Sequence, residues 1–326
     1  MVSSRQLKTK IRAVTNIKQI TKAMQMVSAT KMRRSQEVAL NARPYAKKSF
    51  SLLAHLLKQA NKEELESIFL HAHRSLGEGG EEKIALVVIT SDKGLCGSFN
   101  SSVLRQMIQW KQEQESAGKP FDSAQGKQVD VVAVGRKGRD FCRAREIHIA
   151  AEFFQFSDVA TFADIAPVAD WIMRAYEKKE YDKIVVISNQ FVSALVQKVE
   201  MHQLLPLQID ELERAVQGII PKTGKYSELT QQDQEPVGDI AYVLEPSGEE
   251  IVRILVRNLI QVMITHFIFE SNASEHSARM MAMKNATENA ESMMEALNLE
   301  LNKSRQASIT QQLTEISTAK EALMSE

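Results

Sequence analysis

Hydrophobic positions recur at helical spacing through the first 60 residues, with no glycine among them. Ser3 or Ser4 can cap the start of this helix. Pro44 is its only breaker, so we expect a kink there. At 1.5 Å per residue, an arm of about 57 residues would extend roughly 85 Å. The apolar series comprises Leu7, Ile11, Val14, Ile17, Ile20, Met24, Val27 and Ala29.

A second helical pattern occupies the other end of the chain. From Glu249 to Met324 the sequence contains neither glycine nor proline, so a continuous helix would approach roughly 110 Å. Neither arm fits within one ordinary globule, and interspersed alanines would let the two helices approach closely as an antiparallel coiled coil. The predicted seam on this arm comprises Met280, Met283, Met294, Leu297, Leu301, Ile309, Leu313 and Ile316.

The middle of the chain has a different pattern. Continuous apolar runs of strand length alternate with helical segments, which indicates strands buried on both faces of a parallel, doubly wound sheet. The predicted strands are 84–90, 129–134 and 183–188, and the predicted helices are about 98–117 and 161–179.

The predicted fold class is therefore α/β: an antiparallel coiled coil of the terminal helices plus a small Rossmann-like domain with a mainly parallel sheet. We expect residues 1–60 and 250–326 to form the coiled-coil shaft and 61–249 to form the Rossmann-like domain. Within that domain, 189–210 is predicted to return as a hairpin, and the polar stretch 213–238 is predicted to be a mobile loop.

Charge separates the two arms. Residues 1–48 contain twelve lysines and arginines against Glu37 alone, a net of +11, although the whole chain balances 41 basic against 41 acidic residues. Residues 270–326 carry nine glutamates and five basic residues, a net of −4. The arms are complementary, and the surplus basic charge must face solvent or an acidic partner.

Catalytic and metal-binding patterns are not found in the sequence. The two cysteines do not constitute a disulfide framework, and the seven histidines lack metal-ligand spacing. The most apolar stretch, 254–269, is interrupted by Arg257, Asn258 and His266, so we expect the chain not to cross a membrane. We expect no catalytic, cofactor-binding or metal-binding residue.

Two glycine-containing turns are candidate anion sites. The segment 91–100 joins a strand to a helix, and 134–141 combines two glycines with three basic residues. Neither matches a dinucleotide fingerprint or a phosphate loop, so tight structural turns are the favoured interpretation.

Four strings then identify a family. NIKQITKAMQMVSATKMRRSQ at 16–36, SDKGLCGSFN at 91–100, SNASEHSARMMAMKNATENA at 271–290 and NKSRQASITQQLTEI at 302–316 closely resemble the gamma subunit of the F-type ATP synthase. The resemblance implies a coiled coil within the hexamer of alpha and beta subunits, and a Rossmann-like foot on the c ring beside the epsilon subunit. It implies a rotating, non-catalytic subunit without a small-molecule substrate, peripheral to the cytoplasmic face of the bacterial plasma membrane.

The resemblance also implies contact residues in the first arm. Met24 would face the lever loops of the beta subunits, and Lys31, Arg33 and Arg34 would offer positive charge there. Alternatively, Met24 fills the coiled-coil seam and the basic residues are simply solvated.

In the second arm, Arg305, Gln306 and Thr310 match the family positions that hydrogen-bond a beta subunit catch loop. Tyr242 and Glu245 match the stretch beside the c ring and the epsilon subunit. Departures from the family pattern put single contacts in doubt. These departures are Gln312, Leu301 and Leu244.

Two rival functions remain. A nucleotide-binding enzyme would use the Rossmann-like body, and a nucleic-acid adaptor would use the basic arm. The adaptor is disfavoured because Tyr45 and Phe50 are the only aromatic residues in that arm.

Overall fold

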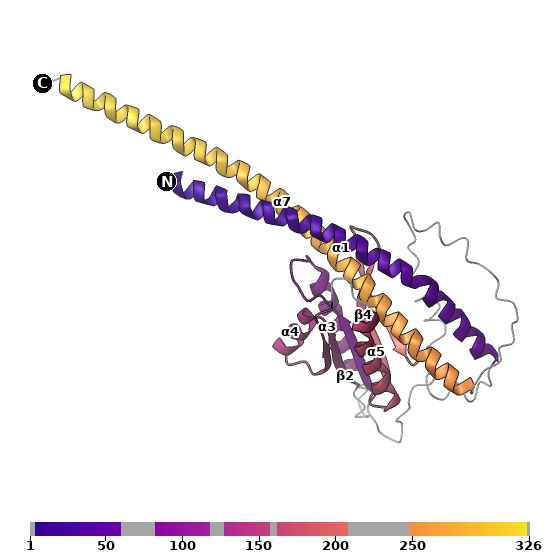
Figure 1. Ribbon diagram of the computed structural model, residues 1–326. Helices are drawn as coiled ribbons and strands as arrows, with labels where there is room; N and C mark the ends of the chain where they lie inside the picture. The colour runs from indigo at the N-terminus through magenta and orange to yellow at the C-terminus, as the bar shows by residue number, and fades with distance from the viewer. Residues whose placement is uncertain (1–3, 60–81, 118–126, 157–161, 208–247, 325–326) are drawn as a thin grey trace. The chain divides into compact units, whose positions relative to one another are not determined.

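The computed structural model describes residues 4–59, 82–117, 127–156, 162–207 and 248–324. The chain divides into two compact units, which we describe separately (Figure 1). The stalk unit comprises Met1–Ala29 with Arg279–Glu326, and the sheet unit comprises Thr30–Ala278. The predicted boundaries at 60 and 250 differ from the limits of these compact units. The predicted division into shaft and Rossmann-like domain remains a prediction.

Both terminal arms are helical, as predicted. Helix α1 spans Ser4–Gln59, and helix α7 spans Gly248–Met324. The helix α1 runs on past Pro44, so the proline does not end it.

The sheet unit contains five strands in the order β3-β2-β1-β4-β5. The first four are parallel, and β5 returns antiparallel to β4 as the predicted hairpin. The α/β prediction with a mainly parallel sheet is therefore confirmed. The strands are β1 Lys83–Ile89, β2 Gln128–Val134, β3 Ile149–Phe153, β4 Lys183–Phe191 and β5 Gln197–Leu205.

Three shorter helices connect the strands. The predicted helices appear as α3 Phe99–Ala117 and α5 Phe162–Glu177. The helix α4, Arg136–Ala144, was not predicted and occupies most of the segment read as a basic turn. The predicted loop at 213–238 lies outside the described residues.

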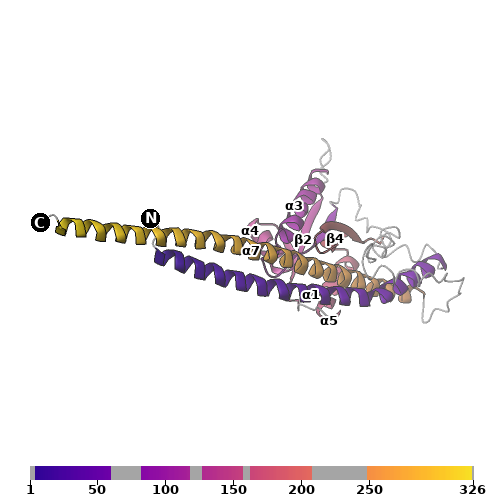
Figure 2. The ribbon, with the colours of Figure 1, turned by 90° about the horizontal axis from the view of Figure 1, so that it is seen from above.

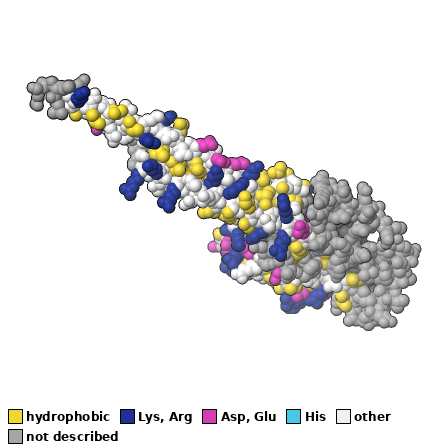
Figure 3. All heavy atoms as spheres, turned by 45° about the horizontal axis from the view of Figure 1, so that its top comes forward, with side chains coloured by type: hydrophobic (Ala, Val, Ile, Leu, Met, Phe, Trp, Pro, Cys, Tyr) yellow, Lys and Arg dark blue, Asp and Glu magenta, His cyan; other side chains and the backbone are white. Residues whose placement is uncertain are grey.

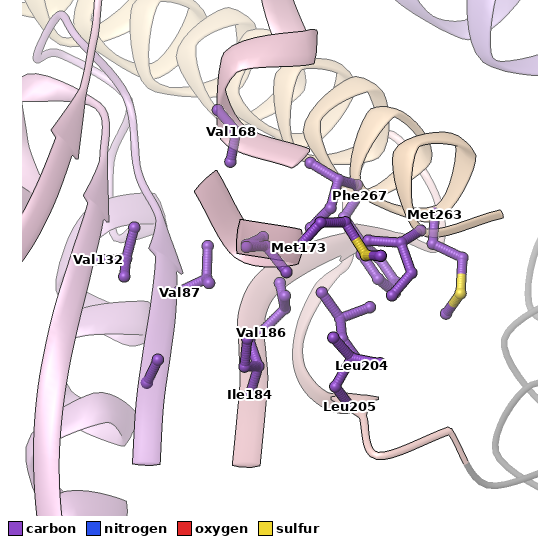
Figure 4. Packing of buried hydrophobic residues seen from close by; sticks show 14 of the residues in the cluster. Val87, Val132, Val168, Met173, Ile184, Val186, Leu204, Leu205, Met263 and Phe267 are labelled. Atoms are coloured by element: carbon purple, nitrogen blue, oxygen red, sulfur yellow. The ribbon is translucent and has the colours of Figure 1, made fainter. Parts of the chain in front are cut away.

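The two faces of the sheet are both buried, which explains the continuous apolar runs. On one face, Val87 lies between Val132 and Val186 in register and packs towards α5 and the first half of α7 (Figure 4). On the other face, Leu86 and Val131 pack against α3. Alternate residues of each strand thus enter two different apolar layers.

The apolar stretch of helix α7 is mostly buried. The stretch Ile254–Lys320 includes an 18-residue window of mean hydropathy 1.2, long and apolar enough by composition to span a membrane. However, 67% of that window is buried inside the structure. Its apolar residues Leu259, Ile260, Ile264 and Phe267 belong to the core of the sheet unit. Packing against the sheet accounts for this pattern.

Candidate functional site

The first glycine-containing turn, at 91–100, is closed by its own side chains. Asn100 Nδ2 donates to Ser91 Oγ at 2.7 Å, and Asn100 Oδ1 accepts from the Ser91 amide at 3.0 Å. Ser91 Oγ also donates to the carbonyl of Lys93 at 2.7 Å. These bonds explain the turn without a ligand.

The second turn supplies its amides to neighbouring residues. At the start of α4, the Arg136 amide donates to Asp92 Oδ1 at 2.9 Å, and the Gly138 amide donates to Thr90 Oγ1 at 2.9 Å. The Lys137 amide donates to the carbonyl of Ser91 at 3.1 Å. The N–H groups that an anion would require are already bonded. The sheet unit therefore uses this helix terminus for packing.

Two buried ionisable groups of the described residues are held in their protonated form. Burial raises the pKa of the Cys142 thiol to about 11, so it stays protonated near neutral pH. Burial likewise raises the pKa of Tyr176 to about 12. Within the described ranges, no three His, Cys, Asp or Glu side chains gather as a possible metal site.

The stalk unit carries the candidate contact surfaces. Its two helices run antiparallel (Figures 1 and 2) and protect side chains from solvent at alternating steps of four and three residues, the repeat of a coiled coil. The predicted coiled coil is thus confirmed. The seam of α1 comprises Leu7, Ile11, Val14, Lys18, Thr21, Gln25 and Ser28, and that of α7 comprises Met283, Thr287, Ala290, Met294, Leu297, Leu301 and Ser304.

Three contacts fix the alignment of these helices. Thr287 Oγ1 lies 2.8 Å from Thr21 Oγ1, and Thr15 Oγ1 lies 3.7 Å from Met294 Sδ. Lys18 Nζ donates to Glu291 Oε1 at 2.6 Å. This bond is the main reason that the pKa of the Glu291 carboxyl is lowered below its usual value. The complementary charges of the two arms therefore meet at Lys18 and Glu291.

The apolar series of α1 predicted the helix correctly, but it leaves the seam after Val14. Ile17, Ile20 and Val27 are 51%, 59% and 53% exposed, and Met24 is half-buried. Two successive steps of three residues, from Val14 to Ile20, rotate the series backwards around a helix of 3.6 residues per turn. We call Ile17, Ile20, Met24 and Val27 the outer stripe. Polar residues occupy the seam in its place.

The predicted seam of α7 is wrong near its end. Residues 305–320 are exposed throughout, because α7 continues past the N-terminal end of α1 (Figures 1 and 2). Ile309, Leu313 and Ile316 are 46%, 62% and 67% exposed. Their spacing of four and three residues places them on one face, which we call the tip stripe.

The predicted contact residues lie in several places. Arg305, Gln306 and Thr310 are exposed in the unpaired end of α7, and Gln312 is exposed beside them. The seam of the stalk unit includes Leu301.

On α1, Arg33 and Arg34 are exposed and Lys31 is half-buried, all in the part that belongs to the sheet unit. Tyr242 and Glu245 lie outside the described residues, as does Leu244. Space-filling shows apolar and basic side chains interspersed along the stalk surface (Figure 3).

Neither stripe was recognised from the sequence as a surface. The signal for the outer stripe was the repeated three-residue step after Val14. The signal for the tip stripe was the unequal length of the two arms, which are helices of 56 and 77 residues.

Comparison with known proteins identifies close relatives. A family model described as ATP synthase matches residues 3–323. The ATP synthase gamma chain of Chloroflexus aurantiacus is 34% identical over 325 residues, covering 100% of both chains. That of Pelotomaculum thermopropionicum is 34% identical over 316 residues, covering 97% of both.

Solved structures share the fold. A chain of the Euglena gracilis mitochondrial ATP synthase, in an assembly of OSCP, F1 and c-ring in rotational state 3, matches with a TM-score of 0.60 at 15% identity. The match covers 98% of this chain and 94% of that chain. A chain from the central stalk and c-ring of the Tetrahymena thermophila mitochondrial enzyme matches with a TM-score of 0.54 at 23% identity, covering 82% and 99%. The resemblance inferred from the four sequence strings is confirmed.

Proposed function

The chain belongs to the ATP synthase gamma chain family, and we propose that it works as the central rotor shaft of that complex. The shaft transmits rotation of the membrane c ring to the catalytic sites of the alpha and beta subunits. Ion translocation is thereby coupled to ATP synthesis or hydrolysis.

One observation carries this proposal. A single helix exposes residues 305–320 on all sides and carries the tip stripe there. An isolated helix of this length is marginal in water, and most helical stability in proteins comes from packing. The tip therefore needs a surrounding partner. A ring of alpha and beta subunits supplies a sleeve that covers every face of the helix.

We propose that the chain contributes no catalytic group and binds no cofactor. The amides of the second glycine-containing turn, which would suit phosphate in a nucleotide-binding enzyme, already donate to Asp92, Ser91 and Thr90. The chemistry then belongs to partner subunits, and this chain acts on it mechanically.

The outer stripe suits contact with the lever loops of the beta subunits. Met24 lies within it, and the exposed Arg33 and Arg34 follow on the same helix, with Lys31 half-buried between. Acidic lever loops would find positive charge here. Exposed ion pairs contribute only about 0 to 1 kcal/mol each, so they can break and re-form as the shaft turns.

The unpaired end of α7 suits the catch loop of a beta subunit. Arg305, Gln306 and Thr310 are exposed there, and a guanidinium can bind a carboxylate through two hydrogen bonds. Gln312, where the family usually has glutamate, removes one charge from this contact.

The remaining contacts follow the family resemblance. Tyr242 and Glu245 would meet the c ring and the epsilon subunit. In functional terms, 1–60 and 250–326 act as the shaft and 61–249 as the foot, with the loop 213–238 within it. The chain is then a peripheral protein held through the c ring at the cytoplasmic face of a bacterial plasma membrane.

Reconstitution with alpha, beta and epsilon subunits and the c ring tests this function. We expect the ATPase activity of the complex to depend on this chain, and deletion of residues 302–326 to weaken ATP-driven ion pumping. A sharper variant replaces the tip stripe by serine (Ile309→Ser, Leu313→Ser, Ile316→Ser). Pumping per ATP should fall severalfold, because the sleeve loses its apolar contact.

The matched control carries serine at Gln311, Thr314 and Thr318, which are also exposed on this end of α7. It should pump normally. Failure of the wild-type chain to join any hexamer of alpha and beta subunits would contradict the proposal.

A further inference from the structure

A buried polar pair interrupts the seam of the stalk unit. Thr21 is 9% exposed and Thr287 is 8% exposed, and their hydroxyl oxygens are 2.8 Å apart. No other hydrogen bond between two hydroxyl groups joins α1 to α7 among the described contacts of the stalk unit.

The hydroxyl protons have a consistent order. Thr21 Oγ1 donates to the carbonyl of Lys18 at 3.1 Å, so its lone pairs can accept from Thr287 Oγ1. Thr287 also has the carbonyl of Met283 at 2.8 Å as a partner within its own helix. Each hydroxyl therefore stays bonded when the helices separate. Each hydroxyl has a single proton, so Thr287 donates either to the carbonyl of Met283 or to Thr21. The buried Thr21 oxygen accepts a hydrogen bond from Thr287 only when the two threonines lie level.

The apolar seam residues cannot supply this alignment alone. Leu, Met and Val contacts are non-directional, and a coiled coil repeats every seven residues. A slip of one heptad in one direction places Thr21 level with Met294, and Thr287 then lies level with Ser28. The opposite slip places Thr21 level with Met280 and Thr287 level with Val14. Either slip loses the bond between the hydroxyls and parts Lys18 from Glu291, since both contacts belong to the same alignment.

We propose that Thr21 and Thr287 are positioning residues that lock the axial register of the antiparallel coiled coil. A single buried polar pair is a known way for a coiled coil to select one register. This register sets how far Met24 on α1 stands from Arg305 on α7, and both belong to the stalk unit. The importance of that distance rests on the proposed shaft function, but the register itself is a property of the isolated chain.

Disulfide cross-linking of the full-length chain measures the register. Ile11 and Asn298 each lie one heptad from Lys18 and Glu291, whose side chains meet. Cysteines at 11 and 298 therefore report the native register, and cysteines at 4 and 298 report the slip of one heptad that places Thr287 level with Val14. Both pairs are introduced after Cys96→Ala and Cys142→Ala.

In the wild-type seam we expect the native pair to cross-link and the slipped pair to cross-link little. In Thr21→Val/Thr287→Val the ratio of native to slipped product should fall about two- to tenfold, because the native register no longer provides a donor to the buried Thr21 oxygen. Thr21→Ser/Thr287→Ser keeps both hydroxyls and should keep the native ratio. Thr9→Val removes an exposed hydroxyl of α1 bonded only within its own helix, and should change nothing.

An unchanged ratio in the double valine variant would overturn the proposal. If that variant loses helical circular dichroism, the cross-linking ratio is measured in Thr21→Val instead, because this single isosteric change breaks the same bond. In the reconstituted complex, the double valine variant should assemble but couple poorly. A chain that shows the register effect yet joins no hexamer would refute the shaft function and leave the register lock standing.

Discussion

The sheet unit and the stalk unit hold together in opposite ways. In the sheet unit, Val87, Val132 and Val186 are fully buried at the centre of the sheet. In the stalk unit, the seam of α1 beyond Val14 consists of Lys18, Thr21, Gln25 and Ser28. The apolar outer stripe of the same helix faces away from the seam. Burial stabilises the first unit, and alignment by polar contacts defines the second.

The difference matches two mechanical tasks. A foot must keep its shape under load, and close packing of apolar side chains resists deformation. A shaft must keep its alignment while presenting apolar faces to partners. It therefore cannot bury all its apolar residues within itself, and it uses specific contacts such as Thr21–Thr287 instead.

The largest expected effect comes from placing a charge in the sheet. Val87→Asp would bury an unpaired carboxylate between two strands, and we expect a loss of about 5 kcal/mol or more in the free energy of unfolding. Leu313→Asp, at a side chain 62% exposed in the tip stripe, should change that free energy by less than about 0.5 kcal/mol. Urea unfolding followed by tryptophan fluorescence measures the first, because Trp110 and Trp171 both pack in the sheet unit. Equal losses of unfolding free energy in the two variants would contradict the difference between the buried sheet and the exposed tip stripe.

A second comparison uses two glycines of the sheet unit. Gly135 has φ 97° and an added Cβ would lie 2.1 Å from the carbonyl oxygen of Thr90, so Gly135→Ala should cost about 3 kcal/mol. Gly97 has φ 58° with open space around it, so Gly97→Ala should cost about 1 kcal/mol. Equilibrium unfolding of both variants checks the order, and a larger loss at Gly97 would contradict it.

The sheet was largely predictable because burial on both faces leaves a local signature. The runs at 84–90, 129–134 and 183–188 became β1, β2 and β4. Strand β3 was missed because Ile149–Phe153 lies at the edge of the sheet, short and only partly buried. Helix α4 was missed because its nine residues include four basic side chains and a glycine, which resemble a solvated turn.

The stalk surfaces were less predictable because they depend on a partner helix. Ile309, Leu313 and Ile316 have the spacing of a seam, and only the end of α1 decides that they are exposed. Ile17 and Ile20 likewise look like core residues until the seam is located on Lys18 and Thr21. The local sequence predicts the helices, whereas the pairing of α1 with α7 determines which of their apolar residues are exposed.

A third prediction concerns close approach of the helices. Ser28 is 3% exposed in the seam, so Ser28→Leu should force the helices apart and cost about 1 to 3 kcal/mol. Its neighbour Val27 is 53% exposed, and Val27→Leu should be nearly neutral. Thermal unfolding followed by helical circular dichroism compares the two. A Ser28→Leu chain with an unchanged Tm would show that the seam tolerates bulk and is not closely packed.

The smallest effect concerns the Lys18–Glu291 bridge. The hydrogen bond from Lys18 lowers the pKa of Glu291 from its usual 4.5, so the bridge adds stability above that value. The contribution is lost as pH falls through the lowered pKa of Glu291 in the folded chain. Salt weakens it because Glu291 is exposed and Lys18 is only half-buried. NMR titration of the Glu291 carboxyl should show the pKa moving up towards 4.5 in Lys18→Gln, with no such shift in Lys8→Gln, which removes an exposed lysine nearer the start of α1. An identical titration in wild-type and Lys18→Gln chains would mean that the bridge does not persist in solution, leaving Thr21 and Thr287 to hold the register alone.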